Sequence, residues 1–506
     1  MKLLAHKYHE NQFRKGEEHL PYIVHPESVV NTLLSWGESP DSPAIPAAWG
    51  HDLLEDTKVT EEEILAVSDE KVLAAIKLLT RPRKMQKSLY MQNIAQNGSR
   101  EVLLVKIADR ICNTRDFIKL EGKLYAFQYL HAADCLLPAL HKLSPDPVAV
   151  RALKEWEELE SSLKEEARLD AVRGCLLGGA AGDALGAPVE FMSKESIKRK
   201  FGPGGIREYV EFPGGEGAIT DDTQMTLFTA EGLLRAKVRG VERGICAPVS
   251  VVHFAYLRWL KTQGIEPDCD STLLNSGKLI EHEELFSRRA PGNTCLSALE
   301  YGAPRAVNNS KGCGSVMRMA PVGLFLAPEE AFHYGCEFSA LTHGHPTAIT
   351  AGGAFVMLIA CLREGKSLEL SLDLTEKHLE KLPESKETLA ALRKARSAAH
   401  IEELGEGWVA EEALAIAVFC ALKHTWDFAA GVIEAVNITG DSDSTGAIAG
   451  NILGVLNGEK KIPQNWMKNL REYALVSSMA DDLSRGIEKT PYGYATPEWE
   501  KKYPGY

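Results

Sequence analysis

The chain has 506 residues, more than one hydrophobic core usually serves, so two or more domains are expected. Its formal net charge of -13 argues against broad binding to nucleic acids or anionic membranes, because both need a basic surface. The ten cysteines include no Cys-x-x-Cys pair, which is typical of reduced thiols and excludes a disulfide framework.

Targeting signals are not expected. We find no apolar run of the roughly 18 residues that a membrane span needs. The N-terminal sequence MKLLAHKYHENQ turns polar too early for a signal peptide. The sequence therefore predicts a cytoplasmic protein without a membrane partner.

The hydrophobic pattern predicts an all-α protein. Apolar positions recur at helical spacing in residues 72–79, 102–107, 413–422 and 448–456. Two prolines in residues 144–147 stop helix propagation and indicate a boundary. We predict a helical domain over residues 1–147, a helical linker over 148–168 and a second helical domain over 169–506.

The first domain contains a mixed set of nitrogen and oxygen ligands: His25 in YIVHP, His51 and Asp52 in GHDLLEDT, and Asp109 in KIADR. Such a set suits a divalent ion with water in the open positions. A single histidine is more often simply hydrogen-bonded, but four such residues followed by an acid pair favour metal binding.

Three polar residues follow the ligands at a helical step. If GHDLLEDT is helical, Glu55 and Asp56 lie four residues after His51 and Asp52, on the face that carries the ligands. An acid or base there can handle the proton of an attacking water. Asn113 follows Asp109 by the same step and is expected to point into the same pocket.

The segments FRKGEEHLPYIVHP, HDLLEDT and KIADRICNTRD resemble the HD-type hydrolase domain of RelA/SpoT-type alarmone enzymes and their small stand-alone relatives, over roughly residues 1–145. The resemblance implies a Mn²⁺ ion on His25, His51, Asp52 and Asp109, with Glu55 and Asp56 activating the water. Arg14, Lys15 and Asn113 are expected to contact the nucleotide.

The substrates implied by this resemblance are guanosine tetra- and pentaphosphate, cleaved at the 3′-pyrophosphate, or a phosphate of NADPH in some small relatives. The stretch LLTRPRKMQKS departs from the Gly-Val-Thr-Lys-like run usual in alarmone enzymes. The identity of the nucleotide is therefore left open.

The second domain carries two oxygen-rich clusters. The first is Thr220, Asp221 and Asp222 in ITDDTQMT, and the second is Asp441, Asp443 and Ser444 in GDSDSTG. Alone, the first would be read as a helix N-cap and the second as a turn. Together they predict a site for two Mg²⁺ or Mn²⁺ ions, which prefer oxygen ligands.

Other segments of this domain predict ligand loops and close helix packing. Gly314 and Ser315 offer backbone N–H groups that could cradle a diphosphate, and His343 is a further candidate for ligand contact. Asp183 is expected to be a structural hydrogen-bond acceptor. The glycines one turn apart in residues 446–454 should let a neighbouring backbone approach closely.

The clusters GDALGAPVE, ITDDTQMT and GDSDSTGAIAGNILG, in this order, resemble the ADP-ribosylglycohydrolase family over about residues 169–470. The resemblance implies an all-α fold and a dinuclear Mg²⁺ or Mn²⁺ site. The implied metal ligands are Thr220, Asp221, Asp222, Asp441, Asp443 and Ser444, the last standing where many members have threonine. Glu190 is implied to face the scissile ribose as a base or gate.

We therefore predict two metal-dependent hydrolases in one chain. The second domain should remove ADP-ribose from a protein or another conjugate, with nucleic acid only as a modified substrate, and the first should hydrolyse a nucleotide. One alternative is a single pathway in which one site acts on the product of the other. Another is a nucleotide sensor, antitoxin or immunity protein in which one domain binds ligand and regulates its neighbour.

Overall fold

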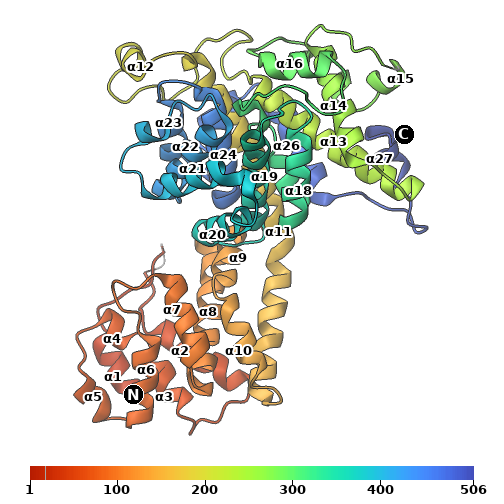
Figure 1. Cartoon of the computed structure of the whole chain (residues 1–506). Helices are drawn as coiled ribbons and strands as arrows, with labels where there is room; N and C mark the ends of the chain where they lie inside the picture. Colours follow the sequence, from red (N-terminus) through yellow and green to blue (C-terminus); the bar gives the residue numbers. More distant parts are fainter. Residues whose placement is uncertain (17–18, 270, 506) are drawn as a thin grey trace. The chain divides into compact units, whose positions relative to one another are not determined.

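The computed structural model describes residues 1–16, 19–269 and 271–505, and within these ranges it is helical, with no strand (Figure 1). The predicted all-α class is thus confirmed. The chain divides into two compact units, Met1–Ala167 and Arg168–Tyr506.

The first unit is organised around α8, which packs against α2, α3, α6 and α9. Its core includes a cluster of Leu53, Val59, Ile64, Val72, Leu73 and Ile76. The elements are α1 (Lys2–Tyr8), α2 (Val24–Ser35), α3 (Ala44–Gly50), α4 (Leu53–Asp56), α5 (Glu61–Leu65), α6 (Glu70–Leu79), α7 (Lys87–Asn97), α8 (Arg100–Leu120), α9 (Lys123–His131), η1 (Asp134–Leu136) and α10 (Leu137–His141).

Helix α11 (Pro147–Gly186) begins at the second of the two prolines and continues beyond residue 168. The predicted linker over 148–168 is therefore the first half of a longer helix and not a separate element. Pro147 stands at the helix start, where its missing N–H would have no intrahelical partner. The assignment of one activity to each side of this helix stays a prediction.

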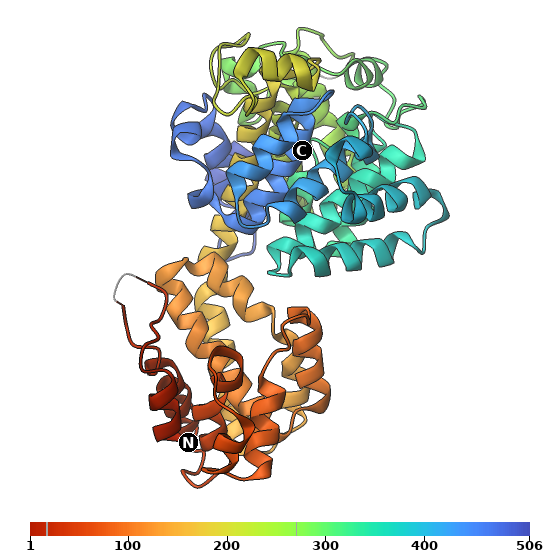
Figure 2. The same ribbon diagram turned by 90° about the vertical axis from the view of Figure 1, so that its left-hand side faces the viewer.

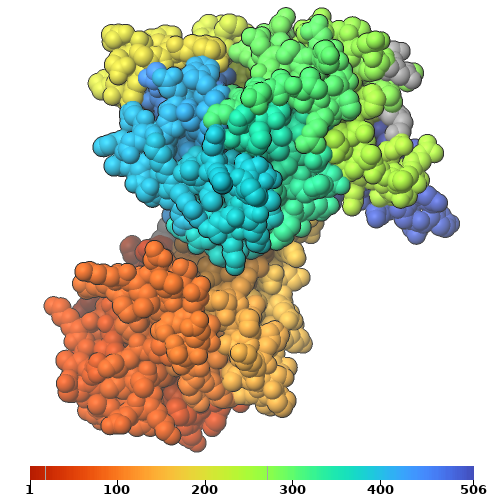
Figure 3. All heavy atoms as spheres, viewed as in Figure 1, coloured from red at the N-terminus to blue at the C-terminus, as the bar shows by residue number. Residues whose placement is uncertain are grey.

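The second unit brings together helices that lie far apart in the sequence (Figure 2). In the space-filling view its surface includes α12 (yellow) and α21 (blue), with closely packed side chains on the face drawn (Figure 3). The elements are η2 (Ala187–Val189), α12 (Lys194–Phe201), α13 (Asp221–Arg243), α14 (Pro248–Thr262), α15 (Ser271–Leu274), η3 (Leu279–Glu281), η4 (Glu283–Leu285), α16 (Asn293–Glu300), η5 (Cys313–Ser315), α17 (Ala320–Phe325), α18 (Pro328–Ser339), α19 (Pro346–Arg363), α20 (Leu368–Leu379), η6 (Pro383–Ser385), α21 (Lys386–Ser397), η7 (Ile401–Leu404), α22 (Ala410–Lys423), α23 (Phe428–Val436), α24 (Ser442–Asn457), η8 (Glu459–Lys461), α25 (Gln464–Asn469), α26 (Tyr473–Arg485) and α27 (Pro497–Lys502).

Helix α19 corrects one expectation. By length and composition this 18-residue helix could cross a membrane, so the chain does contain an apolar run of that length. In the structure 83% of it is buried, and it packs against α17, α18 and α22. An apolar helix surrounded by other helices is the core of a globular unit.

The second half of α11 and α24 lie in backbone contact through glycines spaced four residues apart. A Cβ added at Gly182 would lie 2.0 Å from the carbonyl oxygen of Gly446, and one at Gly450 would lie 2.0 Å from that of Gly178. Gly174 and Gly454 repeat the arrangement one turn further along. The predicted close approach at residues 446–454 is confirmed, and its partner is α11.

We expect Gly450→Ala to lower the free energy of unfolding of the second unit by about 2 kcal/mol, because the new methyl group would clash with backbone and not with a movable side chain. Denaturant titration followed by circular dichroism measures the change. The matched control is Gly240→Ala in α13, where the nearest atom lies 3.9 Å away and alanine should be neutral or stabilising. Equal effects of the two substitutions would contradict the packing argument.

Candidate functional site

The four predicted ligands of the first unit converge. The Nε2 atom of His25 lies 3.1 Å from Oδ1 of Asp109 and 3.3 Å from Nε2 of His51. His51 Nε2 in turn lies 3.1 Å from Oδ2 of Asp52. His25, His51 and Asp109 are buried. They come from α2, the end of α3 and α8, so tertiary packing assembles the set.

The orientation of His51 suits metal binding. Its Nδ1 lies 2.7 Å from the carbonyl oxygen of Ala48, which holds the ring so that Nε2 faces His25 and Asp52. Burial disfavours the charged ring, but the Asp52 carboxylate outweighs this and raises the pKa of His51 to about 9. A cation placed among these atoms would replace that proton.

The predicted acid pair is separated by the structure. GHDLLEDT is not one helix, because α3 ends at Gly50 and α4 begins at Leu53. The carboxylate of Glu55 accepts a hydrogen bond from the backbone N–H of Arg81 at 2.8 Å. Asp56 faces the ligands instead, since the Tyr22 hydroxyl lies 3.1 Å from Asp56 Oδ2 and 2.7 Å from Asp52 Oδ2. Burial, with the nearby Asp52 charge, raises the pKa of Asp56.

Two predicted nucleotide contacts are linked to the same centre. Arg14 donates to Oδ1 of Asn113 at 2.8 Å, and Asn113 donates to Oδ1 of Asp109 at 2.6 Å. Lys15, which follows Arg14 in the sequence, is exposed. Sequence reasoning missed Lys106, whose ammonium donates to Oδ2 of Asp109 at 2.9 Å, although Lys106 stands in the KIADR segment itself. It also missed Tyr22, in YIVHP.

The second unit places its carboxylates at three helix ends, which are the starts of α13 and α24 and, for Glu190, the end of η2. Thr220 is the N-cap of α13, with Asp221 and Asp222 in the first turn. Asp441 is the N-cap of α24, and its side chain accepts from the N–H of Ser444 at 3.3 Å. All of these are buried, and ligand oxygens of Glu190, Asp441 and Asp443 lie within 4.8 Å of one another.

These carboxylates lack a compensating cation among the described residues. Burial, followed by the charges of neighbouring carboxylates, raises the pKa of Glu190 to about 8. Burial also raises the pKa of Asp221 to about 8 and that of Asp222 well above its ordinary value. Oδ1 of Asp222 is buried without a hydrogen-bond partner. A cluster of this kind fits divalent cations, which supply the missing charge and take oxygen ligands.

Two further elements hold the first cluster in place. Asp183 of α11 accepts hydrogen bonds from the N–H of Thr220 at 3.0 Å and from the hydroxyl of Thr223 at 2.5 Å, as expected of a structural acceptor. Gly292 donates to Oδ2 of Asp221 at 3.1 Å. The loop that contains Gly292 therefore anchors a candidate ligand, a role that sequence reasoning missed.

The predicted diphosphate loop, which contains Gly314 and Ser315, packs against the buried side chain of His343. A Cβ at Gly314 would lie 3.1 Å from the His343 ring, and His343 Nδ1 lies 2.8 Å from the Thr342 hydroxyl. Burial and the nearby Arg318 lower the pKa of His343 to about 3, so the ring is neutral at pH 7. The Ser315 hydroxyl donates to the carbonyl of Gly312 at 3.1 Å, so it is already engaged within the loop.

The loop also carries Cys313, which sequence reasoning missed. Burial and the charge of Asp441 raise the pKa of the Cys313 thiol well above its ordinary value, so the loop and the second carboxylate cluster are adjacent. The guanidinium of Arg318 is buried and donates to Tyr256, Cys295 and Thr342. It places a positive charge close to His343.

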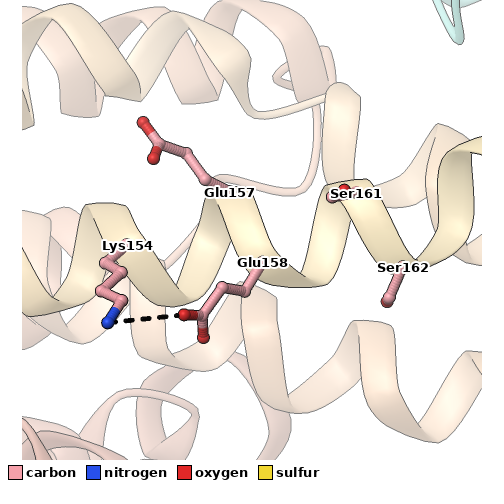
Figure 4. A pocket seen from close by; sticks show the side chains of 5 residues that line it. All are labelled: Lys154, Glu157, Glu158, Ser161 and Ser162. Atoms are coloured by element: carbon pink, nitrogen blue, oxygen red, sulfur yellow. Dashed lines mark ion pairs between the residues drawn. The ribbon is translucent and has the colours of Figure 1, made fainter.

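A separate hollow on α11 contains none of the predicted site residues. It is lined by Lys154, Glu157, Glu158, Ser161 and Ser162, all from one helix (Figure 4). Lys154 and Glu158 are exposed and 3.6 Å apart, a common pair on a solvated helix face. We assign no chemistry to it.

Comparisons with known proteins match both halves of the chain. The sequence model of the ADP-ribosylglycohydrolase family matches residues 164–492. The ADP-ribosyl-[dinitrogen reductase] glycohydrolase of Rhodospirillum rubrum is 26% identical over 309 residues, which cover 60% of this chain and 90% of the relative. The ADP-ribosylarginine hydrolase Tri1 of Serratia proteamaculans is 25% identical over 339 residues, covering 65% and 83%.

The N-terminal region matches a different group of enzymes. The guanosine-3′,5′-bis(diphosphate) 3′-pyrophosphohydrolase MESH1 of Danio rerio is 35% identical over 115 residues, which are 22% of this chain. The match spans 64% of the length of that relative. Both predicted resemblances are thus confirmed, and the relatives on both sides are hydrolases.

We expect the metal-free second unit to become more stable as the pH falls from about 8 towards 4. The folded pKa values of Asp221 and Glu190 are about 8, above their ordinary values of 3.8 and 4.5, so the folded unit binds more protons than the unfolded chain in this window. Saturating Mg²⁺ or Mn²⁺ should raise the Tm more at about pH 8 than at about pH 6, because protons compete with the ion. Scanning calorimetry at both pH values measures this, and equal Tm shifts would contradict it.

Proposed function

Because the chain belongs to the ADP-ribosylglycohydrolase family, we propose that its second unit hydrolyses the bond between the anomeric carbon of ADP-ribose and an acceptor. The observation that carries this proposal is the buried carboxylate cluster that lacks a cationic side chain among the described residues. The proposed substrates are ADP-ribosylated proteins or other conjugates.

The proposed metal ligands are Thr220, Asp221, Asp222, Asp441, Asp443 and Ser444. Two Mg²⁺ or Mn²⁺ ions held there would neutralise the carboxylates and act as Lewis acids on the substrate. The chain prepares this arrangement by fixing two of the carboxylates: Gly292 donates to Asp221, and Asp441 accepts from the N–H of Ser444.

Glu190 is the proposed proton-handling group. Its pKa of about 8 lies close to neutral pH, where one carboxyl can both accept and release a proton. The half-buried side chain lies beside Asp441 and Asp443, two of the proposed metal ligands, which supports this role. We assign the diphosphate to the loop of Gly314 and Ser315. In this loop Gly314 packs against the neutral ring of His343.

For the first unit we propose hydrolysis of a phosphate or pyrophosphate of a nucleotide such as guanosine tetraphosphate. His25, His51, Asp52 and Asp109 are the proposed ligands of a Mn²⁺ ion, which would supply Lewis acidity. Asp56, held by Tyr22, is placed to manage the proton of the attacking water. Glu55 remains a proposed participant, although it contacts the N–H of Arg81.

The remaining contacts of the first unit fit a nucleotide. Asn113 and Arg14 extend outwards from Asp109 as a hydrogen-bonded chain, and Lys15 adds a charge that suits phosphate. We propose that the protein carries both activities in the cytoplasm.

Purified protein with Mg²⁺ or Mn²⁺ is expected to release free ADP-ribose from one class in a panel of ADP-ribosylated peptides and nucleic acids. Asp222→Asn and Asp443→Asn should each lower the rate by roughly 10²-fold or more, because each removes a ligand charge. Mass spectrometry of ADP-ribose measures the release. Metal binding without release on any acceptor would contradict the proposal.

With Mn²⁺, the protein is also expected to release pyrophosphate from guanosine tetraphosphate, and His51→Ala should abolish this while leaving ADP-ribose release unchanged. Asp222→Asn is the reciprocal control, since its site lies in the other unit. Phosphate release from NADPH, measured in the same assay, tests the second nucleotide. Tight nucleotide binding without turnover by metal-saturated protein would instead support the sensor alternative.

A further inference from the structure

We propose that stacking between Phe191 and Trp408 positions Glu190 beside Asp441 and Asp443. The two aromatic residues would be positioning residues, acting through Glu190 on the reaction. This inference rests on the proposed function of the same site, and it adds residues that the metal and substrate assignments do not use.

Polar contacts do not hold Glu190 in place. Its backbone N–H bonds to the carbonyl of Gly186, but within the described part of the chain its carboxylate has neither a hydrogen bond nor an ion pair. The neighbouring carboxylates of Asp441 and Asp443 repel it. A half-buried carboxylate in this position would turn towards solvent unless the adjoining backbone were held.

The backbone after Glu190 is held in an unusual conformation. Phe191 has a φ of 66°, in the left-handed region that a bulky side chain rarely adopts. Its side chain is 73% exposed, so burial does not stabilise this conformation. The contact that does is a stack on Trp408, with ring centroids 5.1 Å apart and planes at 21°. Strained residues of this kind are frequent at functional sites.

Trp408 belongs to the loop that anchors the second carboxylate cluster. The carbonyl of Glu406 accepts the N–H of Asp441 at 2.9 Å, and the indole of Trp408 donates to the Glu406 carboxylate at 3.2 Å. The carbonyl of Trp408 accepts the N–H of Cys313 at 3.1 Å. The stack therefore joins the segment of Glu190 to the loop that holds Asp441.

A second tether follows in the chain and provides the control. The N–H of Lys194 donates to the hydroxyl of Thr439 at 3.0 Å, and its ammonium pairs with the exposed Glu402. An exposed ion pair contributes little. If the stack is what positions Glu190, the loss of the Lys194 side chain should leave the site unchanged.

The first experiment is a double-mutant cycle on Mn²⁺ affinity, which does not require turnover. Isothermal titration calorimetry uses the full-length chain in a His51→Ala background, so that only the second-unit site titrates. Glu190→Gln should weaken Mn²⁺ binding by roughly three- to tenfold, because it removes a nearby negative charge. Phe191→Ala should weaken it equally, and the double variant no further. Trp408→Phe, which keeps the stack, and Lys194→Met should both bind as the parent does.

The second experiment measures ADP-ribose release by the same variants in the wild-type background. Phe191→Ala should lower kcat roughly tenfold or more with KM changed less than about twofold, and Trp408→Phe should restore most of the loss seen in Trp408→Ala. Thermal unfolding excludes a loss of fold.

The outcomes separate the two proposals. Phe191→Ala with unchanged Mn²⁺ affinity, or effects of Glu190→Gln and Phe191→Ala that simply add, would overturn the positioning role. Absence of ADP-ribose release by the wild type would overturn the proposed function alone, since the Mn²⁺ cycle would still report whether the stack holds Glu190.

Discussion

The second unit depends on the backbone contact between α11 and α24. Gly178, Gly182, Gly446 and Gly450 leave no room for side chains between the two helices. The contact brings Asp183, near the end of α11, and Asp443, in the first turn of α24, into one region. Asp183 accepts hydrogen bonds from Thr220 and Thr223 at the start of α13, and these bonds fix the position of the first carboxylate cluster. A larger residue at the glycine contact would separate the helices and, with them, the two carboxylate clusters.

The buried carboxylates of the two units have different neighbours. In the first, basic side chains lie beside the carboxylates: Lys106 and His25 contact Asp109, and His51 contacts Asp52. In the second, burial and mutual repulsion raise the pKa values of Glu190, Asp221 and Asp222, and the neutral His343 adds no charge. The second site therefore has the stronger electrostatic need for bound cations.

The stack of Phe191 on Trp408 offsets the repulsion between Glu190 and the neighbouring carboxylates of the second unit. Within the described residues the Glu190 carboxylate, unlike those of Asp221 and Asp441, has no polar contact of its own. The next residue, Phe191, adopts an unfavourable backbone conformation and has an exposed ring. Its stack on Trp408 compensates for this conformation. The strained backbone at Phe191 thus keeps the charge of Glu190 beside those of Asp441 and Asp443.

Much of the fold and of the candidate site could be predicted from the sequence. Periodicity placed helices at residues 72–79 and 448–456, since the 3.6-residue pattern depends only on local spacing. Residue chemistry indicated the ligand types, and the segments that carry them identified the families. The condition of one continuous helix over GHDLLEDT does not hold, because α3 ends at Gly50 and α4 begins at Leu53. Asp56 contacts the Tyr22 hydroxyl, whereas Glu55 accepts the N–H of Arg81.

Contacts between residues far apart in the sequence became apparent only in the folded protein. Tyr22 against Asp56, Gly292 against Asp221 and Phe191 against Trp408 leave no periodic pattern, because each depends on the path of a loop or the direction of a single side chain. The apolar composition of α19 was equally consistent with a membrane and with a protein core, and packing by neighbouring helices decided it. Residue types set the chemistry that each site can offer, whereas helix packing sets its geometry, since distances between distant segments are fixed only when helices pack.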